Sequence, residues 1–131
     1  MSTVLLAIDD DEQRALAQAD AVATLADGRD DLTAMLFHVF TENPHGASVH
    51  QLSSIRTARE RLTDAGIETM FAESSGNPAD EILTRARDHD VDLISVAGRT
   101  RSPAGKALLG SVSQQVLLEA DQPVLFTTSD V

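Results

Sequence analysis

The sequence predicts an α/β fold in which a mainly parallel sheet carries helices on both faces. Short apolar runs alternate with amphipathic stretches along the whole chain, and this alternation favours parallel strands joined by right-handed crossovers. The chain has 131 residues, 42% of them hydrophobic and 3% aromatic. This length is typical of one domain, and few residues are aromatic. We therefore expect a single domain over residues 1–131 with an aliphatic core.

Five segments are predicted to be strands. Thr3–Ile8 is a continuous apolar run, typical of a strand that is buried on both faces of a sheet. The other four are Leu32–Phe40, Ile67–Glu73, Leu93–Ala97 and Val124–Thr127. Met35 and Met70 lie inside two of these strands, and we expect both side chains in the core.

Four helices are expected between the strands. Apolar residues recur at helical spacing over Glu12–Asp27, and Gly28 follows as a stop signal. The other three are predicted around Leu52–Leu62, from Asn77-Pro78 onward, and at about Ser111–Ala120. Asn77 is a good capping residue, and a proline in the first turn suits a helix start.

The charge balance excludes some classes of partner. Twenty-one acidic residues face ten basic ones, which gives a net charge of −11. Such a surface repels nucleic acid, so we expect no nucleic-acid partner. The chain contains no apolar run of about 18 residues and no signal-peptide pattern. We therefore expect no membrane association and a cytoplasmic location.

Two explanations compete for this acidity. One is an acidic binding face, and the other is the excess of surface carboxylate found in proteins of salt-loving organisms. The acids are spread along the chain, and aspartate outnumbers glutamate 14 to 7. This distribution favours a halophilic source as a hypothesis.

The segment Leu93–Leu118 contains no acidic residue. It holds three of the ten basic residues together with several glycines and a serine: Arg99, Arg101, Lys106, Gly98, Gly105, Gly110 and Ser111. Glycines let backbone N–H groups approach a ligand, and a helix N-terminus carries partial positive charge. The pattern favours an anion-binding loop before the last helix, although a plain connection with a serine cap also fits it.

Several other motifs are absent. Lys106 is followed by Ala107, and its spacing from Gly98 does not match a P-loop. The first strand is followed by Asp9-Asp10-Asp11 in place of a glycine-rich dinucleotide fingerprint. The four histidines show no metal-ligand spacing, and the chain has no cysteine, so no metal site is predicted.

The three aspartates that follow the first strand have two interpretations. They suit an N-cap and the first turn of the next helix. Alternatively, Asp9 contacts a ligand, and a neighbouring carboxylate helps to hold Mg²⁺ through water while the ligand phosphates supply the other oxygens. The residues themselves leave both interpretations open.

The last third of the chain resembles the universal stress protein family. The resemblance rests on the stretch from Val96 to Ser113, which contains Gly98-Arg99-Thr100-Arg101 and Gly110-Ser111, and on Ala120-Asp121-Gln122-Pro123-Val124-Leu125. The opening Val4-Leu5-Leu6-Ala7-Ile8-Asp9 and the segment His89–Ile94 also fit the family. Together these segments extend the resemblance over essentially the whole chain.

The resemblance implies a fold and an assembly. The family fold is a five-stranded parallel sheet of strand order 3-2-1-4-5 with helices on both faces. Members commonly form dimers through the last strand, here Val124–Thr128. An apolar edge strand of this kind is normally covered in proteins, so a homodimer is expected. A further protein partner is expected as well, and the residues do not identify it.

The resemblance also implies a binding site. Family members that bind ATP carry the loop G-x2-G-x9-G-S/T, an aspartate at the end of the first strand, and contacts at the end of the second strand. The implied nucleotide-binding residues are Ala7, Ile8, Asp9, Val39, Ala97, Gly98, Arg99, Arg101, Gly110, Ser111, Val112 and Ser113. The departure is Arg101, which occupies the position of the second glycine. Its guanidinium either crowds the phosphates or binds them as a bidentate donor.

The resemblance therefore implies a stress-response regulatory protein that binds ATP or another adenine nucleotide at the ends of the first and fourth strands. Hydrolysis requires an activated water, and the sequence shows no convincing general base, so turnover is expected to be slow or absent. The alternative is a dimeric interaction module of the same fold that binds no nucleotide. Pyrophosphatase and nucleotidyltransferase signatures of related sheets are absent.

Overall fold

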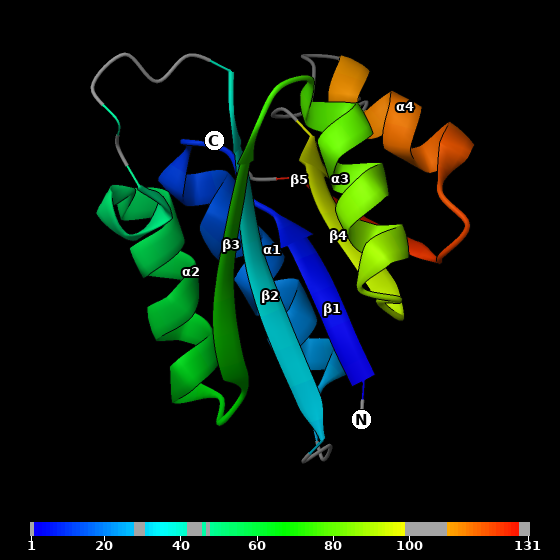
Figure 1. Cartoon of the computed structure of the whole chain (residues 1–131). Coiled ribbons are helices and arrows are strands. Elements are labelled where there is room, and N and C mark those ends of the chain that lie inside the picture. The colour runs from blue at the N-terminus through cyan, green and yellow to red at the C-terminus, as the bar shows by residue number, and fades with distance from the viewer. Residues whose placement is uncertain (1, 28–30, 42–45, 47, 99–109, 129–131) are drawn as a thin grey trace, which may run out of the picture.

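The computed structural model describes residues 2–27, 31–41, 46, 48–98 and 110–128, and these form one twisted parallel sheet with helices on both faces (Figure 1). The elements in chain order are β1 (Ser2–Ala7), α1 (Glu12–Leu25), β2 (Leu32–Phe40), a short 3₁₀ turn (Val49–Gln51), α2 (Ser53–Asp64), β3 (Glu68–Ser75), α3 (Pro78–Asp88), β4 (Leu93–Gly98), α4 (Ser111–Glu119) and β5 (Val124–Thr128). All neighbouring strands pair in parallel, in the order β3-β2-β1-β4-β5. The predicted fold class and strand order are confirmed.

The two faces of the sheet are covered by different helices. One buried cluster joins α1 and α2 to one face of the central strands, and the other joins α3 and α4 to the opposite face. In Figure 1, α1 lies behind the sheet and α3 lies in front of it. Leu5 and Leu6, adjacent in β1, point into opposite clusters and are fully buried. This explains why β1 is apolar at consecutive positions.

The helix starts follow the capping residues. Asp11 caps α1 by accepting the backbone N–H of Arg14 at 2.9 Å, and Asn77 caps α3 by accepting that of Asp80 at 3.1 Å. At α4 the N-cap is Gly110, and Ser111 is the first helical residue. The alternative of an ordinary serine cap at α4 is therefore wrong, because the glycine occupies the capping position.

One core prediction is also wrong. Met35 is 1% exposed, as expected for a central strand, but Met70 is 40% exposed. Met70 lies on β3, which forms one edge of the sheet, and its neighbours in the burial pattern alternate between half-buried and exposed. An edge strand has a partner strand on one side only, so its apolar side chains are less completely covered.

The direction of strand order reverses between β1 and β4. The chain builds β2 and β3 on one side of β1, then crosses to β4 and β5 on the other side. The β1–β4 pairing ends at Leu6 and Ser95, whereas β4 continues to pair with β5 as far as Gly98. The two central strands therefore separate at their carboxyl ends. Ligand sites in open parallel sheets form at such a reversal point.

Candidate functional site

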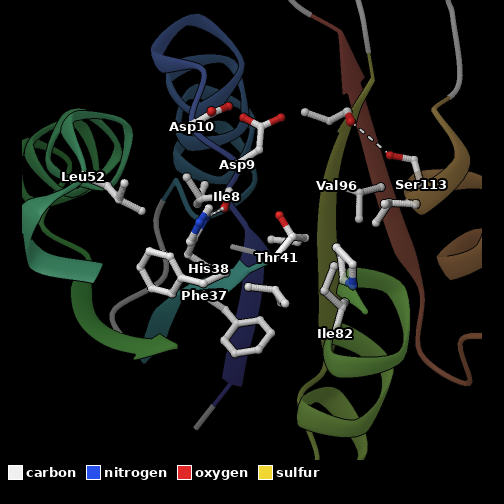
Figure 2. Close-up of a pocket in the computed structure, with 16 residues that line it drawn as sticks. Ile8, Asp9, Asp10, Phe37, His38, Thr41, Leu52, Ile82, Val96 and Ser113 are labelled. Carbon is white, nitrogen blue, oxygen red and sulfur yellow. Dashed lines mark hydrogen bonds between the residues drawn. The ribbon is translucent and has the colours of Figure 1, made fainter. Parts of the chain in front are cut away.

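A cavity of about 570 Å³ lies at the carboxyl ends of β1, β2 and β4 (Figure 2). Its lining residues come from the three strand ends and the residues just after them, from the N-cap of α2, from the first two turns of α3 and from the first turn of α4: Ala7, Ile8, Asp9, Asp10, Phe37, His38, Val39, Phe40, Thr41, Leu52, Pro78, Ile82, Val96, Ala97, Val112 and Ser113. Most of these side chains are apolar, and the acidic ones, Asp9 and Asp10, lie at one rim. A largely apolar cavity with a few fixed polar groups is typical of a small-molecule site.

Many of the predicted binding residues meet at this cavity. Those that line it are Ala7, Ile8, Asp9, Val39, Ala97, Val112 and Ser113. Gly98, Gly110 and Ser111 lie at the adjoining ends of β4 and α4 but are not among the lining residues. Arg99 and Arg101 lie outside the described residues. Most of the predicted binding residues that the structure describes therefore lie together at this cavity, although they come from strands that are distant in the sequence.

The end of β1 is held by side chains from three other elements. The Nε2 of Gln18 in α1 donates to the carbonyl oxygen of Ala7 at 3.1 Å. The Nδ1 of His38 in β2 lies 2.7 Å from the carbonyl oxygen of Ile8, so this nitrogen must be the protonated donor. The Oγ of Ser54 in α2 donates to the carbonyl oxygen of Asp9 at 2.6 Å. Three successive carbonyls are therefore fixed.

Both carboxylate oxygens of Asp9 also have partners. Oδ1 accepts the backbone N–H of Asp11 at 2.9 Å, and Oδ2 accepts Nε of Arg14 at 2.8 Å. The Asp9 side chain nevertheless remains 47% exposed at the cavity rim. The capping interpretation of the three aspartates is thus realised by Asp11, while Asp9 stays accessible for a ligand hydroxyl.

The opposite side of the cavity is formed by the start of α4. Val112 and Ser113 line the cavity, and the Oγ of Ser113 donates to the carbonyl oxygen of Ala97 at 3.0 Å. This bond, drawn as a dashed line in Figure 2, ties the first turn of α4 to the end of β4. The N-terminus of α4 therefore lies beside the cavity, and its partial positive charge favours an anionic group there.

Sequence reasoning missed Gln18 and Ser54 as residues of this region. Both are 1% exposed, and each interrupts an otherwise apolar helix face. Gln18 is three residues after Ala15 in α1, and Ser54 is four residues before Ala58 in α2. A polar residue inside a buried stripe must find a hydrogen-bond partner, and this signal was present in the sequence.

Two further features are absent from the residues that the structure describes. No cluster of three or more histidine or acidic side chains there has the arrangement of a metal site. Within the same residues, no helix combines the length and apolar character needed to cross a membrane.

Comparison with known proteins identifies relatives for this chain. The model of the universal stress protein family matches residues 1–127. A universal stress protein of Mycolicibacterium smegmatis is 38% identical over 72 residues, which are 54% of this chain and 55% of that protein. The chain therefore spans about half the length of that relative. A universal stress protein of Thermus aquaticus is 32% identical over 94% of this chain and 96% of its own length.

Solved structures of the same family share the fold. A universal stress protein from Archaeoglobus fulgidus has a TM-score of 0.77 at 24% identity and covers 96% of this chain and 98% of its own. An A. fulgidus universal stress protein in complex with dAMP has a TM-score of 0.72 at 20% identity, with coverage of 96% and 97%. An Arabidopsis thaliana family member with AMP bound has a TM-score of 0.71 at 17% identity, with coverage of 100% and 93%.

Proposed function

The chain belongs to the universal stress protein family, and from this premise we propose that it binds an adenine nucleotide, ATP or AMP, as a stress-response regulatory protein. The observation that carries the proposal is the cavity at the ends of β1 and β4. It lies where the strand order reverses, and most of its walls are apolar. Family structures with dAMP and AMP bound give the proposal its ligand class.

Each part of a nucleotide has a chemically suitable surface. The base suits the apolar side chains around Val39 and Phe40, because a planar aromatic ring gains most from burial against apolar groups. A ribose hydroxyl suits the Asp9 carboxylate as an acceptor. The phosphates suit the N-terminus of α4, and Arg99 and Arg101, which precede it in the acid-free stretch, supply the opposite charge.

The proposal includes slow or absent hydrolysis. In this proposal Asp9 contacts the ribose and not the γ-phosphate, so it does not activate an attacking water. In this proposal any Mg²⁺ arrives with ATP and is held by the phosphates.

The test begins with what the protein carries. Protein purified in molar KCl is denatured with acid, and the released small molecules are identified by chromatography and mass spectrometry. A stoichiometric adenine nucleotide supports the proposal. If the protein is empty, titration calorimetry with AMP, ATP and Mg-ATP in the same salt decides the question. No heat of binding with any of the three contradicts the proposal.

A second candidate function is a dimeric interaction module that binds no nucleotide. The observation in its favour is β5, an edge strand whose residues Val124–Thr128 are all partly exposed. We propose that β5 pairs with its copy in a second chain, in either function, because unpaired strand edges are normally covered. Light scattering in molar salt tests this pairing, and a monomer mass contradicts it. An empty but dimeric protein favours the second candidate.

We also propose that the acidity is an adaptation to high salt. A net charge of −11 destabilises the compact state through self-repulsion, and salt screens that repulsion. The melting temperature should therefore rise from low salt to molar KCl. An unchanged melting temperature would contradict a halophilic origin.

A further inference from the structure

We propose that Gln18, His38 and Ser54 form a clamp on β1 that sets the shape of the nucleotide site before the ligand arrives. We call these three side chains, with the carbonyls of residues 7–9 that they hold, the β1 clamp. The inference rests on the proposed function, because it assigns these residues an effect on nucleotide affinity. Gln18 and Ser54 act as positioning residues through the backbone, whereas His38 holds the backbone and also lines the cavity itself.

The clamp holds consecutive carbonyls at and just after the end of β1. Three successive carbonyls are each bonded to a side chain from a different element: Ala7 to α1, Ile8 to β2 and Asp9 to α2. Ala7 is the last residue of β1, and Ile8 and Asp9 follow it. The three partners belong to three different elements, so this segment is fixed from several sides.

Gln18 has a second role at the point where β1 and β4 separate. Its Nε2 lies 3.1 Å from the carbonyl oxygen of Ala7 and 3.1 Å from that of Ser95, and 3.2 Å from Oγ of Ser95. The pairing of the two strands ends at Leu6 and Ser95. The amide of Gln18 thus bridges β1 and β4 where their direct pairing stops, and it fixes the separation of the two strands behind the cavity wall.

The clamp acts on a part of the cavity wall that a ligand would meet. Ala7, Ile8 and Asp9 all line the cavity, and the Asp9 carboxylate is fixed in addition by Arg14 and Asp11. Gln18 and Ser54 are not among the lining residues, and both are 1% exposed. Their effect on a bound nucleotide is therefore indirect. A wall fixed in advance spares the ligand the entropic cost of ordering it.

The chain offers matched controls for both buried donors. Ser54→Ala removes the bond to Asp9, while Ser53→Ala changes its exposed neighbour in the first turn of α2. Gln18→Met removes the bonds to Ala7 and Ser95 at similar side-chain volume, while Gln13→Met changes an exposed glutamine of α1. The two pairs lie on different helices, so one remains informative if a variant of the other fails to fold.

The experiment measures AMP affinity by titration calorimetry at a temperature where circular dichroism shows every variant fully folded. We expect Ser54→Ala and Gln18→Met to bind AMP about tenfold more weakly than wild type, and the controls to stay within about twofold. A loss of stability alone leaves the affinity of the folded protein unchanged. The amide ¹H–¹⁵N resonances of residues 8–11 should also shift in the ligand-free clamp variants, which reports the displaced wall directly.

The outcomes separate the two proposals. If wild type binds AMP and the clamp variants bind it as tightly as their controls, the clamp inference is overturned and the proposed function stands. If wild type binds neither AMP nor ATP, the proposed function is overturned, and the assigned effect on affinity is lost with it. Weaker binding together with shifted resonances in a clamp variant supports both.

Discussion

The two strand ends that border the cavity are held in different ways. At the end of β1, three successive carbonyls are bonded to side chains from α1, β2 and α2, and only residues 8–11 separate this strand from its helix. At the end of β4, the Ala97 carbonyl is held by the hydroxyl of Ser113, and residues 99–110 separate the strand from α4.

This difference indicates different roles for the two sides of the cavity. The β1 side supplies a wall whose backbone is fixed by buried donors, and so it determines where Asp9 lies. The sequence after β4 contains the glycines and the cationic residues of the acid-free stretch, and in the proposed function these residues supply the charge that attracts an anion. Substitutions on the β1 side should therefore cost stability, and those on the β4 side should cost little.

The strongest test of this comparison is the stability of Gln18→Met. The variant leaves the carbonyls of Ala7 and Ser95 without their side-chain donor in a buried environment. We expect the free energy of unfolding to fall by about 2–3 kcal/mol, measured by denaturant titration. The exposed control Gln13→Met should change it by less than about 0.5 kcal/mol. Equal effects of the two variants would remove the distinction between the strand ends.

The next effect concerns ligand affinity. Asp9→Ala removes the carboxylate at the cavity rim, and we expect AMP to bind about tenfold more weakly, which corresponds to about 1.4 kcal/mol. Calorimetry measures the affinity, and Asp10→Ala is the control because Asp10 lines the same rim and is exposed. If Asp9→Ala binds AMP as wild type does, Asp9 serves only to anchor Arg14 and Asp11.

Much of this fold could be predicted from the sequence, and the failures have physical causes. Continuous apolar runs identified the central strands because both faces of β1 are buried, and Asn77-Pro78 marked the start of α3 because capping is a local interaction. The exposure of Met70 was missed because a side chain's hydrophobicity does not reveal that its strand lies at an edge. Local sequence patterns thus predict helices, strands and caps, but they do not predict whether a strand lies at the centre or at the edge of the sheet.

The site itself was only partly predictable. Asp9, Val39 and Ser113 were identified through family resemblance, and the structure places all three at the cavity. The polar character of Gln18 and Ser54 on buried helix faces indicated that each needs a partner, but it did not identify the partners, because Gln18 is 77 residues from Ser95 of β4 and Ser54 is 45 residues from Asp9. The parallel topology brings such pairs together, and the spacing of residues in the sequence does not predict which residues will pair.

A smaller effect is expected on the β4 side. Ser113→Ala removes the hydroxyl that donates to the Ala97 carbonyl, and we expect the free energy of unfolding to fall by about 1 kcal/mol. Denaturant titration of Ser113→Ala and Gln18→Met in one series compares their losses in the free energy of unfolding. A loss equal to or larger than that of Gln18→Met, whose amide bonds both Ala7 of β1 and Ser95 of β4, would contradict the expected order of the two effects.

The smallest effect on stability is expected at the N-cap of α4. Gly110 has φ −72° and ψ 164°, which any residue adopts, and among the described residues a Cβ added there meets no atom within 4 Å. Serine is a good N-cap, so Gly110→Ser should change the free energy of unfolding by less than about 0.5 kcal/mol. If the glycine serves a ligand, the same variant should weaken AMP binding measured by calorimetry, because its side chain stands where phosphates approach the helix. Loss of stability without loss of affinity would reverse this assignment and make the glycine a requirement of the fold.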